Sequence, residues 1–353
     1  MSVVLEYIWL DSDSEFRSKT KVVDTIIDTR FIETLPLWNY DGSSTGQAEG
    51  TDSEIILKPV FICKDPFRIS LNSFLVLCET YDKKMNPLNN NYRVFANKIF
   101  NNYKTQEPWF GLEQEYFIMN KGVPFGFEYG TPEAQGKYYC GVGSGRALGR
   151  KIVDEHLEYC LYANLKIGGV NAEVAPGQWE FQIGPLDNVQ VGDHLLVARY
   201  ILNRVAENYG YNISYHPKPL GVDADWNGSG CHTNFSTKEM RDENGIKHIF
   251  GALESLKEYH KIHIKSYGKD NEMRLSGKHE TSNINSFTIG VANRGSSIRI
   301  PNETVKNNKG YFEDRRPAAN IDPYLVCSLI LQGVNDNLYI LKNKMMETID
   351  YII

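Results

Sequence analysis

The chain has 353 residues, of which 41% are hydrophobic and 23% charged, and its formal net charge is -6. These proportions are typical of a globular protein, and the length predicts about two domains. The negative charge and the lack of a basic cluster argue against nucleic acid or an anionic membrane as the main partner, and no apolar run approaches the roughly 20 residues of a membrane span.

The first part of the chain predicts strands and turns. Strand patterns cover 3–10, 16–23, 54–62 and 73–78, and a loop rich in Gly, Ser and Asp covers 39–53. The amino terminus has no basic segment and acquires acidic residues early, so we interpret it as the first strand and not as a signal peptide. The polar stretch 83–91, with its Asn86-Pro87 turn signal, marks the domain junction. We expect a small β-rich domain at 1–85 and a larger α+β domain at 86–353.

The second part predicts helices mixed with strands. Helical patterns cover 92–103, 147–164 and 249–266. A further helix covers 193–208, with Asp193 as its N-cap and Gly210 as its stop, and the last begins at Asp322-Pro323. Six cysteines are widely spaced, and none forms a Cys-x-x-Cys pair. They predict reduced, mostly buried thiols in a cytoplasmic protein and no disulfide framework or zinc site.

Two acidic segments of the larger domain carry the strongest chemical signal. Glu113 and Glu115 are two residues apart in an apolar run, so on a strand both carboxylates would face the same side. In the segment 171–184, Glu180 and Gln182 alternate with apolar residues and predict a second strand with one polar face. Carboxylates aimed at one space repel and raise each other's pKa, and divalent cations with oxygen ligands are the usual remedy. The alternative is two ordinary strands with a solvated acidic face.

A glycine-rich turn, 227–230, is followed closely by His232 and Ser236. Its backbone amides could approach an anion, and His232 could be a metal ligand or a phosphate donor. The glycines alone are more often a plain tight turn, and the turn together with His232 and Ser236 is the stronger signal. Neither a P-loop nor a Rossmann fingerprint is present.

Arginines follow at Arg274, Arg294, Arg299 and Arg315, the last close to Glu313. They suit phosphate and carboxylate recognition, with surface salt bridges as the alternative. Together, the acids, the turn and the arginines predict a metal-dependent nucleotide enzyme that performs phosphoryl transfer.

Longer motifs give a more specific identification. The segments 38–45, 109–116, 171–184, 227–236, 279–285, 293–301 and 311–317 resemble glutamine synthetase in its short, eukaryote-type form, in the same order. The resemblance runs from about Tyr7 to Pro323. It implies a β-grasp-like amino-terminal domain and a catalytic domain whose antiparallel sheet carries the metal-binding carboxylates.

The resemblance also implies a role for each matching residue. One divalent ion would be held by Glu115, Glu173 and Glu180, and a second, near the nucleotide phosphates, by Glu113, His232 and Glu313. Glutamate would be bound by Arg274, Arg315, Asn227 and Gly228. Arg294 and Arg299 would contact phosphates, and Trp109 and Ser236 would lie near the nucleoside of ATP. Glu280 would belong to a closing flap, and Asp41 of a neighbouring subunit would take a proton from ammonium.

The implied reaction is the ATP-dependent ligation of ammonia to the γ-carboxylate of glutamate through an acyl phosphate, with two or three Mg²⁺ or Mn²⁺ ions per site. Water would destroy that intermediate, so a flap that excludes it has a clear purpose. The implied assembly is a homodecamer of two five-membered rings with sites between subunits. Two alternatives stay open: ligation of glutamate to another amine, and a catalytically silent ring protein.

Two departures from the family pattern bear on these expectations. The chain starts almost at its first strand, without the amino-terminal arm of many relatives, and this concerns contacts between subunits. The segment 221–225 is slightly longer than the family pattern and could alter the loop beside the nucleotide.

Overall fold

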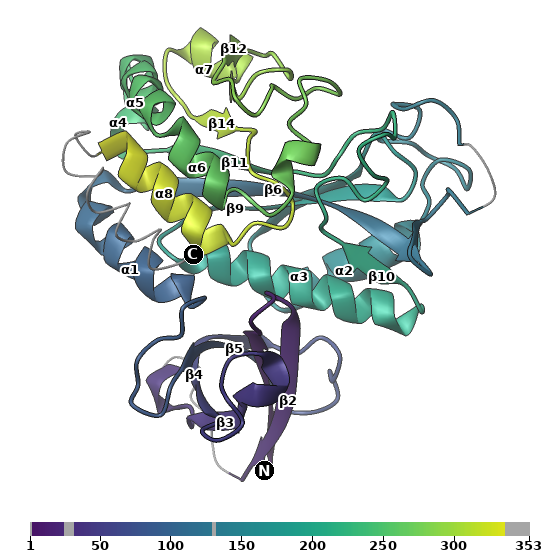
Figure 1. Cartoon of the computed structure of the whole chain (residues 1–353), viewed down its shortest axis with the longest axis vertical. Helices are drawn as coiled ribbons and strands as arrows, with labels where there is room; N and C mark the ends of the chain where they lie inside the picture. The colour runs from purple at the N-terminus through teal and green to yellow at the C-terminus, as the bar shows by residue number, and fades with distance from the viewer. Residues whose placement is uncertain (1, 25–31, 129–131, 336–353) are drawn as a thin grey trace. The chain divides into compact units, whose positions relative to one another are not determined.

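A computed structural model describes residues 2–24, 32–128 and 132–335 (Figure 1). Contacts divide these residues into two compact units, one comprising 2–24, 32–95 and 159–165, and the other comprising 96–128, 132–158 and 166–335. The junction expected at 83–91 lies shortly before Ala96, where the second unit begins.

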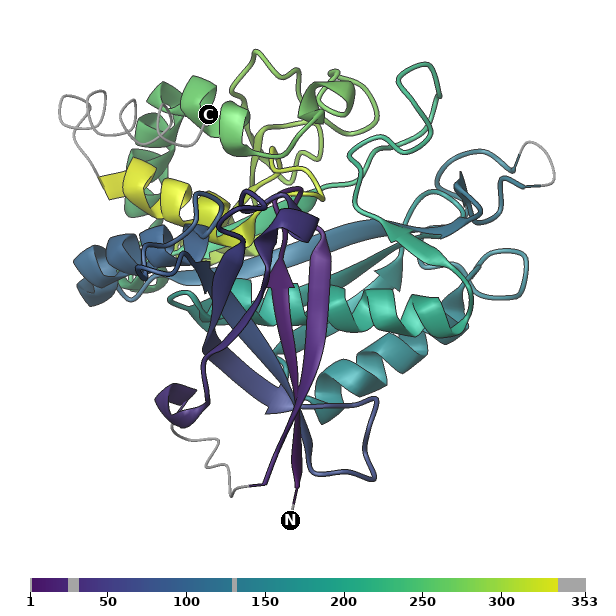
Figure 2. The same ribbon diagram turned by 60° about the horizontal axis from the view of Figure 1, so that its bottom comes forward.

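The first unit contains one five-stranded sheet. Its strands are β1 (Val3–Leu10), β2 (Phe16–Val23), β3 (Trp38–Asp41), β4 (Glu54–Lys64) and β5 (Ser73–Tyr81), in the order β2-β1-β5-β4-β3 (Figure 2). The central pair β1 and β5 is parallel and the other pairs are antiparallel. The predicted strands at 3–10 and 16–23 are confirmed, and those at 54–62 and 73–78 each extend slightly further.

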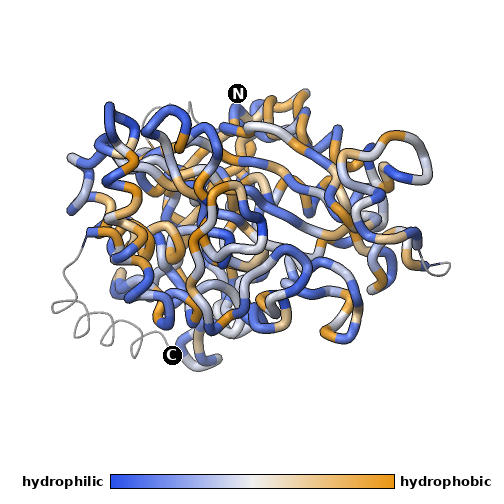
Figure 3. The backbone as a smooth tube through the Cα atoms, turned by 90° about the horizontal axis from the view of Figure 1, so that it is seen from above, coloured by the Kyte–Doolittle hydropathy of each residue, from blue (hydrophilic) through white to orange (hydrophobic). Residues whose placement is uncertain are grey.

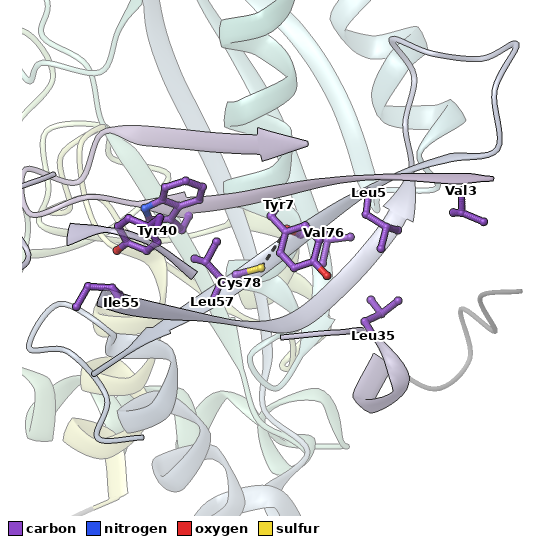
Figure 4. Packing of buried hydrophobic residues seen from close by; sticks show 10 residues of the cluster. Val3, Leu5, Tyr7, Leu35, Tyr40, Ile55, Leu57, Val76 and Cys78 are labelled. Atoms are coloured by element: carbon purple, nitrogen blue, oxygen red, sulfur yellow. Dashed lines mark hydrogen bonds between the residues drawn. The ribbon is translucent and has the colours of Figure 1, made fainter. Parts of the chain in front are cut away.

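One face of this sheet forms a hydrophobic core. Leu5, Tyr7, Leu57 and Val76 are fully buried and pack together with Cys78 (Figure 4). The side chains come from alternate positions of neighbouring strands, because successive residues of a strand point to opposite faces. The edge strand β2 carries exposed polar residues instead, which discourages pairing with another chain.

The second unit is built on a nine-stranded sheet. Its strands are β6 (Trp109–Asn120), β7 (Val123–Pro124), β8 (Ile167–Ala172), β9 (Gln178–Asp187), β10 (Asn212–Ser214), β11 (Cys231–Ser236), β12 (Ile289–Val291), β13 (Ile298–Ile300) and β14 (Phe312–Asp314). The order is β12-β13-β14-β11-β6-β9-β8, and β7 and β10 pair with the far end of β6. All pairs are antiparallel except β12 with β13. The α+β class is confirmed.

Eight α-helices accompany the strands in the described residues: α1 (Tyr92–Tyr103), α2 (Arg150–Tyr162), α3 (Gln190–Asn208), α4 (Lys238–Arg241), α5 (Ile246–Glu258), α6 (His260–Ser266), α7 (Asn302–Asn307) and α8 (Pro323–Asn335). The long helix α3 packs on β6 and β9, and α8 packs against α3, α5 and α6 (Figure 1). Apolar side chains of α3 and α8 therefore form the core on this side of the sheet.

Two helix predictions need correction. Asp193 is not an N-cap, because α3 begins at Gln190, and the Asp193 carboxylate instead accepts a hydrogen bond from the Tyr324 hydroxyl inside the core. The stretch predicted as one helix at 249–266 forms two helices, which meet at Tyr259. The predicted cap at Asp322 is confirmed, since its carboxylate accepts from the Leu325 amide at 2.9 Å.

The thiols are as expected. All six cysteines are unpaired, and all except Cys140 are buried. None of the helices in the described residues is long and apolar enough to cross a bilayer. Figure 3 shows polar and apolar residues interspersed along the chain.

Candidate active site

Strand register brings the predicted acidic residues of the second unit together. Glu113 and Glu115 are two apart on β6, and so share one face of the sheet. Glu115 lies directly opposite Glu180 on β9, and Glu113 lies opposite His232 on β11. The expectation of two strands with a shared carboxylate face is confirmed by this pairing.

The shared face borders a cavity of about 300 Å³. Most of the predicted site residues of this unit line it, namely Glu113, Glu115, Glu173, Glu180, Asn227, Gly228, His232, Arg274, Glu280, Arg294, Arg299 and Arg315. Because they come from strands and loops far apart in the sequence, the fold alone gathers them into one site.

Two groups of side chains in or next to this cavity could each hold a cation. In one group, ligand atoms of Glu113, His232 and Glu313 lie within 4.8 Å of one another, and in the other, those of Glu115, Glu180 and His232 do. The His232 Nδ1 atom is 3.4 Å from Glu113 Oε2 and 3.5 Å from Glu313 Oε1, and its Nε2 atom is 3.8 Å from Glu115 Oε1. His232 therefore stands between the two groups.

The protonation of these groups is governed mainly by burial. Loss of solvent, followed by repulsion from neighbouring carboxylates, raises the pKa of Glu173 to about 8 and that of Glu180 to about 9. Burial also raises the pKa of Glu115. Burial and then nearby arginines hold the pKa of His232 well below its usual range, so its imidazole is neutral at pH 7 and can act as a ligand.

Arginines neutralise part of this acidic cluster. Arg299 Nε is 2.8 Å from Glu313 Oε2, and Arg315 Nη1 is 2.7 Å from Glu313 Oε1. On the rim, Arg294 is 3.4 Å from Glu280. The two pairs at Glu313 are not the exposed salt bridges of the alternative interpretation, since Glu313 is only 1% exposed and Arg315 only 8%. The Arg294–Glu280 pair, in contrast, is exposed on both sides.

The contacts of the glycine-rich turn indicate close packing of its backbone against neighbouring residues, and they do not indicate an anion-binding loop. The Gly230 amide donates to Glu115 Oε2 at 2.8 Å. The Asn227 amide donates to the side-chain oxygen of Gln135, and the Ser229 amide donates to the carbonyl oxygen of Pro217. A Cβ at Gly230 would lie 2.5 Å from Arg274 Nη2, and one at Gly228 would lie 2.1 Å from the Pro217 carbonyl oxygen. The glycines thus admit the backbone next to Arg274 and the acidic cluster.

Trp109 and Ser236 do not line this cavity. They lie opposite each other at the ends of β6 and β11, where the Arg241 guanidinium covers the Trp109 ring at 3.9 Å and donates to the Ser236 hydroxyl at 3.0 Å. Trp109 is 43% exposed, so a flat ring system could reach its edge.

Asp41 belongs to the other unit and ends strand β3. Its carboxylate accepts from the amide and the hydroxyl of Ser43, at 3.0 and 2.7 Å, and from the Ser44 hydroxyl at 3.0 Å. These hydrogen bonds, that of the Ser43 hydroxyl foremost, lower the pKa of Asp41 to about 2. Asp41 is therefore an exposed carboxylate held in one orientation.

Five further residues line the cavity that the sequence analysis did not assign to the site: Tyr139, Asn171, Gln182, His279 and Thr281. Strand alternation already places Gln182 on the polar face with Glu180, and the same two-residue spacing relates Asn171 to Glu173. Tyr139 and His279 come from irregular loops, where no strand alternation marks them, although His279 opens the motif 279–285.

The donors present fit divalent cations well. Several carboxylate oxygens and one neutral imidazole converge, and burial makes their negative charge costly unless a cation offsets it. Arginines beside them suit anionic substrates. The fold and the site thus define a metal-dependent enzyme acting on anions.

Comparison with known proteins makes this class specific. Residues 91–346 match the family model described as glutamine synthetase, catalytic domain. The chain is 52% identical over 334 residues to glutamine synthetase of Candida glabrata, covering 94% of this chain and 88% of the relative, and 51% identical over 337 residues to that of Saccharomyces cerevisiae, covering 94% and 89%. It is also 54% identical over 334 residues to a protein of Acanthamoeba polyphaga mimivirus, covering 94% of both chains. The chain belongs to the glutamine synthetase family.

The fold has a solved counterpart. A Plasmodium falciparum glutamine synthetase determined by cryo-electron microscopy superposes with a TM-score of 0.73 at 15% identity, over 94% of this chain and 71% of the other.

Proposed function

We propose that the protein catalyses the ATP-dependent ligation of ammonia to the γ-carboxylate of L-glutamate, yielding L-glutamine, ADP and phosphate. The observation that carries this proposal is the convergence of a metal-ligand cluster and four arginines on one cavity in a chain of the glutamine synthetase family. An oxygen of the glutamate γ-carboxylate attacks the γ-phosphorus of ATP and releases ADP. The ammonia nitrogen then attacks the acyl carbon, and phosphate leaves.

The acidic residues would hold two or three divalent ions, Mg²⁺ or Mn²⁺. Glu115, Glu173 and Glu180 form one ligand set, and Glu113, His232 and Glu313 form the other. When bound, such ions neutralise phosphate oxygens during transfer. The close grouping of Glu113, His232 and Glu313 supports the second set most directly.

The arginines would bind the anionic parts of the substrates. Arg274 is buried, and its Nη2 atom donates to the Arg315 carbonyl oxygen at 2.8 Å, which fixes the guanidinium next to Gly230 and His232. We assign Arg274 and Arg315, with Asn227 and Gly228, to glutamate. We assign Arg294 and Arg299 to phosphate groups, with Arg299 stabilising the charge that develops in the transition state. Trp109, Glu113 and Ser236 complete the ATP site.

Deprotonation of ammonium falls to two carboxylates. Glu280 lines the cavity, and we place it in a segment that closes over the acyl phosphate. We assign the second role to Asp41 of a neighbouring subunit, because its low pKa keeps it anionic and able to attract ammonium. This arrangement requires an oligomer, and we propose a cytoplasmic decamer of two five-membered rings. In each subunit, a β-grasp-like domain at 1–85 would precede the catalytic domain at 86–353.

The decisive experiment measures phosphate release and glutamine formation from ATP with Mg²⁺ or Mn²⁺, with and without glutamate and ammonium. We expect release to require both substrates and to match glutamine mole for mole. Release that needs glutamate but is unchanged by ammonium would indicate another amine acceptor. No release from an assembled protein would refute the proposal and favour a silent ring protein.

A further inference from the structure

Arg199 is a buried cation on the opposite face of the metal-binding strands. It lies on α3, is 6% exposed, and makes no salt bridge within 4.0 Å to any described carboxylate. Its guanidinium instead donates to neutral oxygens, those of the Gln114 side chain and of the Ala319 and Ile321 backbone carbonyls. A buried arginine normally has a carboxylate partner, so this set of acceptors needs an explanation.

Gln114 is the residue between Glu113 and Glu115, and its side chain points away from them because successive residues of a strand face opposite sides. The side chain is fully buried. Its Oε1 atom accepts from two nitrogens of Arg199, with Nε at 2.8 Å, and its Nε2 atom donates to the Glu115 and Ala319 carbonyl oxygens at 2.8 and 3.0 Å. All the polar atoms of this side chain are therefore engaged.

The same arginine reaches the segment that follows Glu313 and Arg315. Arg199 Nη1 donates to the Ile321 carbonyl oxygen, and Nη2 to that of Ala319, both at 2.9 Å. The Ala319 amide in turn donates to the carbonyl oxygen of Ser229, within the glycine-rich turn. One guanidinium thus joins the centre of β6 to the chain that leaves β14.

We infer that Arg199 is a positioning residue for the metal site. Through its hydrogen bonds to Gln114 and to the segment after β14, it fixes the distance from β6, which carries Glu113 and Glu115, to β14, which carries Glu313. This inference rests on the proposed ligand roles of Glu113, Glu115 and Glu313. The planar fork of arginine suits the task because it holds three acceptors in fixed directions, whereas an ammonium is a point charge without that geometry. Mutation of a residue that orients metal ligands through hydrogen bonds typically lowers metal affinity or activity by about 10- to 100-fold.

Asp322 is an acidic residue on the same face of the sheet as Arg199. Burial raises the pKa of Asp322 to about 6, and the charge of Arg199 only partly opposes that rise. The Asp322 carboxylate is used by the Leu325 amide at the start of α8. Asp322 therefore does not provide Arg199 with a hydrogen-bonded carboxylate partner, and Arg199 keeps its hydrogen bonds to Gln114 on β6.

The test is a titration of the assembled, substrate-free protein with Mn²⁺, followed by electron paramagnetic resonance. We compare Arg199→Met and Arg199→Lys with Arg204→Met, a control that removes an arginine from the same helix away from Gln114. Glu115→Gln serves as the reference for loss of a ligand. Thermal unfolding in EDTA reports stability separately, without metal.

We expect Mn²⁺ to bind about tenfold more weakly to Arg199→Lys and up to about 100-fold more weakly to Arg199→Met, while Arg204→Met binds as the wild type does. If Arg199→Met does not fold, Arg199→Lys decides. Unchanged Mn²⁺ affinity in Arg199→Lys, whatever its melting temperature, would overturn the inference. Unchanged affinity in Glu115→Gln would instead refute the proposed metal site itself.

Discussion

Glu115 and Glu180 lie directly opposite each other on β6 and β9, and both side chains line the same cavity. Like charges facing each other across a pair of strands destabilise a sheet. Here the burial of both residues increases that cost, so the pair is stable in the folded protein only when it is protonated or offset by positive charge.

Glu180→Gln tests this relationship directly. The substitution replaces an ionisable carboxyl group by a neutral amide of nearly the same shape, so the metal-free protein no longer has to take up a proton at this position when it folds. We therefore expect it to unfold at a higher temperature at neutral pH, and we expect kcat to fall about 100-fold or more. Both effects are measured on one preparation, by calorimetry in EDTA and by glutamine formation with Mg²⁺. Glu254→Gln, an exposed change on α5, is the matched control. Wild-type turnover by Glu180→Gln would contradict the ligand role.

The raised pKa values predict how stability depends on pH. The unfolded chain loses the protons of Glu173 and Glu180 near pH 4.5, whereas the folded, metal-free protein keeps them until about 8 and 9. Because the folded state binds more protons in this window, its free energy of unfolding falls as pH rises through it. Divalent ions need deprotonated ligands, so we expect Mg²⁺ to raise the melting temperature more at about pH 8.5 than at about pH 6. Equal shifts at both pH values would argue against metal binding by these carboxylates.

Much of the fold and the site could be predicted from sequence because both depend on local patterns. Strand alternation placed Glu113 with Glu115, and the cap at Asp322 is a local signal. Asp193 was misassigned because its partner, Tyr324, is 131 positions away in the sequence. The glycine turn was ambiguous for the same reason, since its close neighbours Arg274 and Pro217 are known only once the chain is folded. Arg199 gave no signal, because its acceptors are mostly backbone oxygens from a distant segment.

Arg315→Lys tests the proposed role of Arg315 in binding glutamate. The guanidinium donates to Glu313 and to the carbonyl oxygen of Arg294 from two different nitrogens. The single ammonium of lysine cannot make both hydrogen bonds in the same geometry. Losing one hydrogen bond to a charged group costs about 1.5–3 kcal/mol, so we expect the KM for glutamate to rise at least tenfold. Steady-state kinetics at saturating ATP measures this change, and Arg146→Lys, on an exposed loop, is the control. An unchanged KM would exclude Arg315 from glutamate binding.

Gly230→Ala tests whether the turn exists to admit Arg274. The added methyl group would lie 2.5 Å from Arg274 Nη2 and 2.9 Å from His232 Nε2, so both side chains must move. We expect activity to fall at least tenfold, because about 1 Å of displacement in a catalytic site commonly costs more than that. Gly251→Ala is the counterpart, since it sits in α5 with no atom within 4 Å. That change should stabilise the protein by about 0.5–1 kcal/mol and leave turnover intact. Full activity in Gly230→Ala would refute this account of the turn.

The pairing of Glu313 with both Arg299 and Arg315 has a consequence for how ligands bind. A guanidinium that turns from Glu313 to an anionic substrate exchanges one acceptor for another, so the free energy it gains is then the difference between two ion pairs. If Glu313 holds a divalent ion, as proposed, that ion would lower the cost of the exchange, and by thermodynamic linkage the substrate would strengthen metal binding by the same factor. On the proposed roles, the apparent affinity for glutamate would then depend on metal occupancy, and the divalent-ion concentration around the protein would set how much substrate it retains.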